Sequence, residues 1–183
     1  MPVTEATYER LALEDLEGQW EYLCGQIRQK PPMTHEHEDS SWWLAHLLQI
    51  QLSRREFQVR HNGSRTHRPT SSYFIPDVIV VPFDYFKATR GTGDLESFAD
   101  PLPFVAEVWS KSTGGYDVDT KFDEYKKRGD LEIWRLHPYE KSIIAWRRQA
   151  DGAYSETRYA FSDGEAPVLS LPGVVVRFEE IFE

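Results

Sequence analysis

Two acidic residues interrupt apolar segments in the middle of the chain. Asp77 opens the apolar run of IPDVIVV, and Glu107 lies inside the apolar run of FVAEVW. A carboxylate in such surroundings is costly unless it is paired or bound to a cation. Two carboxylates that converge from neighbouring strands also repel each other, and a hard divalent cation with oxygen ligands relieves that repulsion. The pair therefore predicts a site for Mg²⁺ or Mn²⁺ with Asp77 and Glu107 as ligands.

A lysine would complete this set, and the sequence offers two candidates. Lys121 lies four residues from both Asp117 and Tyr125, so all three share one face of an expected helix. Lys111 lies four residues after Glu107 and would share its face only if the strand continued that far. The STGG segment argues against such a continuation, so Lys121 is favoured over Lys111. Its ammonium group would orient an attacking water and offset developing negative charge.

These features also have ordinary structural explanations. Asp117 and Lys121 could form an ion pair within one helix, worth about 0.2–0.5 kcal/mol. Asp77 and Glu107 could belong to a purely structural polar network. With these alternatives open, the reaction that the residue types favour is metal-dependent phosphodiester hydrolysis, in which the cation lowers the pKa of a bound water.

The segment before Asp77 is the one clearly basic part of the sequence. In SRREFQVRHNGSRTHRP the basic side chains would contact phosphate groups beside the site, or would cover a solvated loop and an edge strand. The arginines of this segment are Arg54, Arg55, Arg60, Arg65 and Arg68. The chain as a whole has a formal net charge of −9, which argues against broad, non-specific binding of nucleic acid.

The elements that must hold these groups read as a single mixed α/β domain over residues 1–183. Apolar spacing and end signals predict helices over residues 4–17, 35–52 and 117–128, the last ended by Gly129. Apolar runs predict strands over 73–81, 104–109 and 131–136. Alternation predicts hairpins over 19–30 and 142–161, and residues 84–101 read as a surface loop.

Apolar run length, the first residues and the cysteine count indicate where in the cell we expect the protein. The sequence has no apolar run near the roughly 20 residues that span a bilayer, so we expect no membrane contact. The first residues are acidic and polar, which is not the pattern of a signal peptide. A single cysteine permits no disulfide within the chain and fits a reducing compartment, so we expect a cytoplasmic protein.

The order of the motifs resembles that of a known family. IPDVIVV, PFVAEVWSKST, D-x-x-x-K-x-x-x-Y and G-x-x-E-I-W follow one another as in the bacterial family called Uma-two, which is assigned to the PD-(D/E)XK nuclease superfamily. The segment EYLCGQI is similar to a hairpin of that family. The segment from His35 to His37 and the C-terminal hairpin followed by GVVVRFEEIF extend the likeness to most of the chain.

The resemblance implies a restriction-endonuclease-like fold, with a mixed central sheet flanked by helices and with peripheral β-hairpins. It implies that Asp77 and Glu107 bind Mg²⁺ or Mn²⁺ and that Lys121 is the catalytic lysine, moved from a strand to a helix. The usual lysine position of the superfamily, two residues after the glutamate, is Trp109 here. Glu21 matches a further acidic position near the site, with a solvated hairpin residue as the alternative.

Accessory roles at the site are expected for Glu21, Ser110, Asp117 and Tyr125. A DNA substrate and a homodimer are expected from the resemblance to the superfamily, since cutting both strands usually needs two sites. The alternative is a catalytically inactive module of the same fold that binds nucleic acid or protein.

Overall fold

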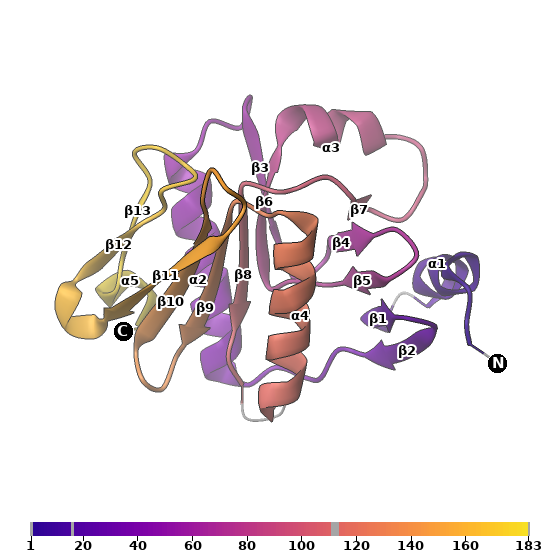
Figure 1. Cartoon of the computed structure of the whole chain (residues 1–183), viewed down its shortest axis with the longest axis horizontal. Coiled ribbons are helices and arrows are strands. Elements are labelled where there is room, and N and C mark those ends of the chain that lie inside the picture. Colours follow the sequence, from indigo (N-terminus) through magenta and orange to yellow (C-terminus); the bar gives the residue numbers. More distant parts are fainter. Residues whose placement is uncertain (1, 16, 111–113, 183) are drawn as a thin grey trace.

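Six strands form the central sheet of the computed structural model, which describes residues 2–15, 17–110 and 114–182, with the backbone alone for residues 89 and 114–118. Their order is β11-β10-β9-β8-β6-β3 (Figure 1). Strands β8 and β9 pair in parallel, and the other neighbours pair antiparallel, so the sheet is mixed. The bounds are β3 Phe57–His61, β6 Val78–Pro82, β8 Phe104–Val108, β9 Glu132–His137, β10 Ser142–Arg148 and β11 Tyr154–Ala160.

Helices cover both faces of this sheet, α2 (His35–Gln51) on one side and α4 (Gly114–Arg128) on the other (Figure 1). The continuous apolar run of β6 follows from this double cover, because successive side chains of a strand point to opposite faces. Val78 and Val80 pack into the core on the α2 side. Ile79 and Val81 point the other way and pack into the core on the α4 side.

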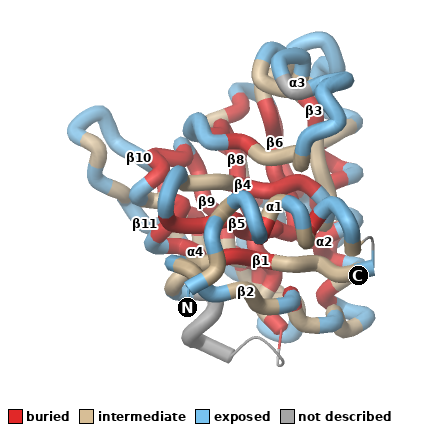
Figure 2. Tube along the Cα trace, turned by 90° about the vertical axis from the view of Figure 1, so that its right-hand side faces the viewer, coloured by how far each residue is buried: buried red, intermediate tan, exposed pale blue. Residues whose placement is uncertain are grey.

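A second sheet, in the order β2-β1-β5-β4-β7, lies beside the central one. Helix α1 (Glu5–Glu14) contacts strand β1 of this sheet. Tyr8, Tyr22 and Tyr73 pack together in a small aromatic core between the helix and the sheet. Figure 2 shows that the buried trace runs through the strands while parts of α1 and α3 are exposed. The strands are β1 Trp20–Leu23, β2 Gln26–Gln29, β4 Arg65–Arg68, β5 Ser72–Phe74 and β7 Ser97–Phe98.

The expectation of one strand over residues 73–81 is wrong. The chain leaves the second sheet after β5 and enters the central sheet with β6, and Ile75, Pro76 and Asp77 lie between the two. Proline has no N–H to donate to a ladder, and the Ile75 N–H donates to the Glu21 carboxylate at 2.9 Å instead. The break therefore places Asp77 where the two sheets meet.

The expected loop over residues 84–101 is also wrong, since it contains most of helix α3 (Phe83–Thr89) and strand β7. Pro82 occupies the N-cap position of α3 without a side-chain hydrogen bond, and the short strand β7 pairs in parallel with β4. Both expected hairpins are confirmed as β1–β2 and β10–β11. The predicted helices 35–52 and 117–128 correspond to α2 and α4, while the first helix already ends at Glu14.

A short C-terminal unit completes the cover on the α2 side of the sheet. It comprises the 3-10 turn η1 (Phe161–Asp163), the hairpin of β12 (Glu165–Pro167) and β13 (Val175–Arg177), and helix α5 (Glu179–Phe182). Ala166, Val176 and Ile181 pack into the core beneath α2. Among the described residues, no helix has the length and apolar character that crossing a bilayer requires.

Candidate active site

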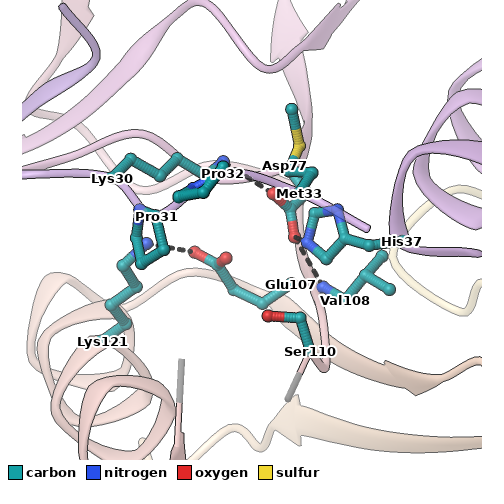
Figure 3. Close-up of a pocket in the computed structure, with 10 residues that line it drawn as sticks. All are labelled: Lys30, Pro31, Pro32, Met33, His37, Asp77, Glu107, Val108, Ser110 and Lys121. Atoms are coloured by element: carbon teal, nitrogen blue, oxygen red, sulfur yellow. Dashed lines mark hydrogen bonds and ion pairs between the residues drawn. The ribbon is translucent and has the colours of Figure 1, made fainter. Parts of the chain in front are cut away.

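The register of the central sheet brings Asp77 and Glu107 to one cavity. Strands β6 and β8 pair antiparallel with Val78 opposite Ala106, so the next residues outward, Asp77 and Glu107, follow at the same end of the pair. Figure 3 shows both carboxylates facing the same space rather than opposite faces of the sheet. Asp77 is fully buried and Glu107 is 5% exposed.

Three donors hold the Asp77 carboxylate. Lys30 Nζ lies 2.6 Å from Oδ1. The Val108 N–H donates to Oδ2 at 2.7 Å, and His37 Nε2 lies 3.0 Å from the same oxygen. These groups come from the end of β2, from β8 and from the first turn of α2. Asp77 therefore connects three elements at the end of the central sheet where β6 begins.

The Glu107 carboxylate faces α4. The Tyr125 hydroxyl donates to Glu107 Oε1 at 2.5 Å, and Lys121 Nζ lies 3.5 Å from the same oxygen. Lys121 Nζ also contacts Glu21 Oε1 at 2.7 Å. Glu21 is 1% exposed, because its strand β1 packs against the site rather than into solvent. One ammonium group therefore bridges two buried carboxylates.

Burial acts to raise the pKa of both central carboxyl groups, but their neighbours leave them with different pKa values. Burial alone would raise the pKa of Asp77, but Lys30 and His37 outweigh it and hold that pKa below its usual range. Burial raises the pKa of Glu107 to about 7, although Lys121 opposes the rise. Burial lowers the pKa of Lys121, but the neighbouring carboxylates, Glu107 first, raise it above its ordinary value. The site thus combines a strongly ionised acid, an acid poised near neutrality and a charged lysine.

The cavity between these groups is small, about 20 Å³, and its lining includes Asp77, Glu107, Ser110 and Lys121. A volume of this size holds roughly one water molecule. The connection from β2 to α2 covers one side of it, with Pro31, Pro32 and Met33 in the wall (Figure 3).

The donor chemistry of the cavity suits a hard divalent cation. Asp77 and Glu107 offer carboxylate oxygens, and Mg²⁺ commonly takes one or two carboxylates from a protein and keeps several waters. Among the described residues, no three His, Cys, Asp or Glu side chains are grouped so that they could hold a metal ion. A cation at Asp77 would therefore rely on this carboxylate pair, on water and on substrate oxygens.

Residues 6–179 match the family described as "Uma2: Putative restriction endonuclease". The chain belongs to the Uma2 family. This confirms the family that the order of motifs predicts, and the match covers both carboxylates and the lysine of the cavity.

The fold agrees with this assignment. The crystal structure of "a putative nuclease belonging to DUF820" from Anabaena variabilis ATCC 29413 superposes with a TM-score of 0.80 and 18% sequence identity, over 99% of this chain and 98% of that one. The expected restriction-endonuclease-like fold is confirmed. The "Uncharacterized protein sll1609" of Synechocystis sp. is 26% identical over 117 residues, which are 63% of this chain and 64% of that protein.

The structure brings together most of the residues that the sequence singles out in this Uma2 chain. Lys121 reaches Glu21 and Glu107 from α4, while the usual lysine position of the superfamily is Trp109. Glu21 is buried at the site, which excludes the alternative of a solvated hairpin residue. Ser110 lines the cavity, whereas Lys111 and the side chain of Asp117 lie outside the described residues.

The five arginines do not form one surface beside the site. Arg60 pairs with Glu96, Arg68 pairs with Glu124, and Arg65 is 8% exposed with its Nε donating to the Tyr8 hydroxyl. Arg54 and Arg55 are exposed, but they precede β3, whose first residue Phe57 lies opposite Pro82 at the far end of β6 from Asp77. The expectation that this segment flanks the site is therefore wrong for Arg54 and Arg55.

The sequence does not predict that Lys30 and His37 contact Asp77. Lys30 stands before Pro31 and Pro32 at the end of a hairpin, which is an ordinary position for a solvated lysine. Its burial depends on contacts of its side chain with Ile75 and Asp77 in the break before β6, and no local pattern reports contacts so distant in sequence. His37 lies within the helix that the sequence predicts over residues 35–52, but its distance to Asp77 depends on how α2 packs against the sheet.

Proposed function

We propose that this chain is a metal-dependent nuclease that hydrolyses phosphodiester bonds of DNA. The observation that carries the proposal is the convergence of Asp77, Glu107 and Lys121 on one buried cavity from the start of β6, from β8 and from α4. Membership in a family described as putative restriction endonucleases supports the same reaction. The reaction adds water to the phosphorus and releases an alcohol and a phosphate monoester.

In this proposal Asp77 and Glu107 would hold Mg²⁺ or Mn²⁺. When bound, such an ion supplies charge neutralisation at the phosphate and a bound water of lowered pKa. Lys121 is charged in the folded chain, so its ammonium group can stabilise negative charge on the reacting phosphate. Tyr125 and Glu21 act as positioning residues, because they hold Glu107 and Lys121 in place. We further propose that two chains act together as a homodimer on the two DNA strands.

A second candidate function is a non-catalytic module that binds nucleic acid or protein. Two observations favour it: a cavity of about 20 Å³ admits no phosphodiester group as it stands, and lysines already lie within 4 Å of both carboxylates. The nuclease remains the better conclusion, because a binding surface gives no reason to bury Asp77, Glu107 and Lys121 together.

Cleavage of supercoiled plasmid by purified protein tests the two candidates against each other. We expect nicked or linear product with Mg²⁺ or Mn²⁺ and none with EDTA. The variants Asp77→Asn and Glu107→Gln keep the shape of the side chains but weaken metal binding, and we expect activity to fall at least about a hundredfold in each. The matched control is Glu156→Gln, an exposed carboxylate on β11 outside the cavity lining, and we expect it to leave activity unchanged.

Cleavage that persists in both site variants at the wild-type rate would assign the activity to another site or to a contaminant. Binding of DNA without any metal-dependent product, by a folded wild-type protein, would favour the non-catalytic module instead.

A further inference from the structure

Lys30 is a buried lysine whose ammonium group has three partners. Its Nζ donates to Asp77 Oδ1 at 2.6 Å, to Asn62 Oδ1 at 2.9 Å and to the Ile75 carbonyl at 3.0 Å. An ammonium group carries three hydrogens, so this arrangement uses all of them. The residue is 8% exposed, which means that little water competes for these bonds.

These contacts place Lys30 in direct competition with any cation at Asp77. Oδ2 already accepts from the Val108 N–H and faces His37 Nε2, so Oδ1 is the oxygen left for a metal. That oxygen is the one Lys30 holds. A divalent ion on Oδ1 would lie within a few ångströms of the ammonium charge, and like charges at such separations in a dry site repel strongly.

We propose that Lys30 is a built-in counter-cation of Asp77, which a divalent ion must displace in order to bind. The inference rests on the proposed function, since it takes Asp77 as a metal ligand. In the metal-free chain Lys30 neutralises a carboxylate that would otherwise be buried alone, and this stabilises the fold. The same contact weakens the affinity of the site for divalent ions.

Lys30 also stands beside the wall of the cavity, so its replacement by a divalent ion at Asp77 would affect that wall. Lys30 begins the connection that continues through Pro31, Pro32 and Met33 over the cavity to the first turn of α2. Its ammonium group is bound to Asp77 and Asn62, and its backbone N–H donates to the Gln19 carbonyl at 2.7 Å. Release of the ammonium group would remove these side-chain contacts at one wall of the cavity and leave the backbone hydrogen bond to Gln19 in place.

Calorimetric titration of Mn²⁺ into the full-length, metal-free protein tests the inference without any measurement of nuclease activity. Lys30→Met keeps the aliphatic stem and removes the charge, and we expect its dissociation constant for Mn²⁺ to fall about tenfold or more relative to wild type. The matched control is Lys127→Met, which removes an exposed α4 lysine paired with Glu124 and is expected to bind Mn²⁺ as the wild type does.

Thermal unfolding of the same proteins gives a second readout. In EDTA we expect Lys30→Met to melt below the wild type, because Asp77 has lost its strongest partner. Saturating Mn²⁺ is expected to raise its melting temperature by more than it raises that of the wild type, as linkage requires for tighter binding.

A milder variant keeps the inference testable if Lys30→Met fails to fold. Asn62→Gly removes one acceptor of Lys30 and suits the left-handed backbone at this position, where φ is 48°. We expect it to bind Mn²⁺ about twofold to threefold more tightly than the wild type, because Lys30 is held less firmly.

The outcomes separate this inference from the proposed function. If Lys30→Met or Asn62→Gly binds Mn²⁺ no more tightly than the wild type while Asp77→Asn loses binding, the role of Lys30 is overturned and the metal site at Asp77 stands. If no variant and no wild-type protein binds Mn²⁺, both are overturned.

Discussion

Asp77 and Glu107 line one cavity, yet their environments favour opposite protonation states. Lys30 and His37 keep Asp77 ionised against the effect of burial. Glu107 shares Lys121 with Glu21 and accepts from Tyr125, and burial prevails there. A pair in which one acid is firmly charged and the other titrates near neutrality can accept or release a proton at ordinary pH, which is a common property of reactive sites.

The shift at Glu107 predicts how stability changes with pH in the metal-free protein. The pKa of Glu107 is 4.5 for the free side chain and about 7 in the folded chain, so the folded state binds more protons between these values. Protonated Glu107 therefore stabilises the folded state fully below the pKa of the free side chain. This stabilisation is lost as pH rises through the pKa of Glu107 in the folded chain. We expect Glu107→Gln, which cannot ionise, to gain stability relative to wild type as pH rises.

Urea unfolding in EDTA from about pH 5 to about pH 8 measures this effect, which should amount to on the order of 3 kcal/mol across the range. The exposed control Glu156→Gln should show a constant difference from wild type. A constant difference for Glu107→Gln as well would mean that this carboxyl titrates normally in the folded chain.

At the residue scale, the sequence predicted the carboxylates, the helical lysine and their neighbours Tyr125 and Glu21, but not the partners of Asp77. Asp77 and Glu107 stand out because each interrupts an apolar run, which is a local signal. Lys121 stands out through its spacing from Tyr125 on one helix face. Lys30 gives no such signal, because its burial arises only when its side chain reaches Ile75 and Asp77, which are far from it in the sequence.

At the scale of elements, α4 determines where Lys121 and Tyr125 lie. The helix begins at Gly114 and ends at Arg128, and the following Gly129 has φ 86°, the left-handed conformation of a common C-terminal cap. The N–H of Gly129 donates to the Tyr125 carbonyl at 3.1 Å, which closes the last turn. The end of the helix is therefore fixed by a backbone conformation that glycine adopts at low cost.

Substitution of this cap should destabilise the protein through the backbone alone. A Cβ at Gly129 would meet its nearest neighbour, Arg148 Nε, at 3.6 Å, an ordinary contact. We therefore expect Gly129→Ala to lower the free energy of unfolding by about 1 kcal/mol, because alanine is strained in the left-handed conformation that glycine adopts freely. The matched control Gly63→Ala also places its Cβ 3.6 Å from the nearest atom, but φ there is not left-handed.

Urea unfolding compares the two alanine variants, and the control should stay within about 0.5 kcal/mol of wild type. Equal losses in the two variants would indicate that packing, rather than the cap, determines the cost at Gly129.

The elements themselves were partly predictable. Helical spacing located α2 and α4, and alternation with a Gly turn located the β10–β11 hairpin, because these signals lie within one segment. The break at Pro76 was missed, since a continuous apolar run from 73 to 81 does not reveal that its two halves join different sheets. Helix α3 and strand β7 were missed because short elements among glycines and acids resemble a loop.

At the scale of the whole molecule, the net charge of −9 and the proposed DNA substrate are in tension. The basic segment does not resolve it, because Arg60 and Arg68 pair with acids and Arg54 and Arg55 lie at the opposite end of the sheet from Asp77. A divalent ion at the site would supply positive charge where a phosphate must approach. We therefore expect DNA binding by this chain to depend on the metal more heavily than DNA binding by a basic nuclease.

The most direct test is an anomalous difference map from crystals of the wild-type protein soaked in Mn²⁺. We predict a peak within coordination distance of both Asp77 and Glu107, with the Lys30 ammonium withdrawn from Asp77 Oδ1. No peak at this pair under saturating Mn²⁺, with Lys30 still 2.6 Å from Asp77, would contradict it.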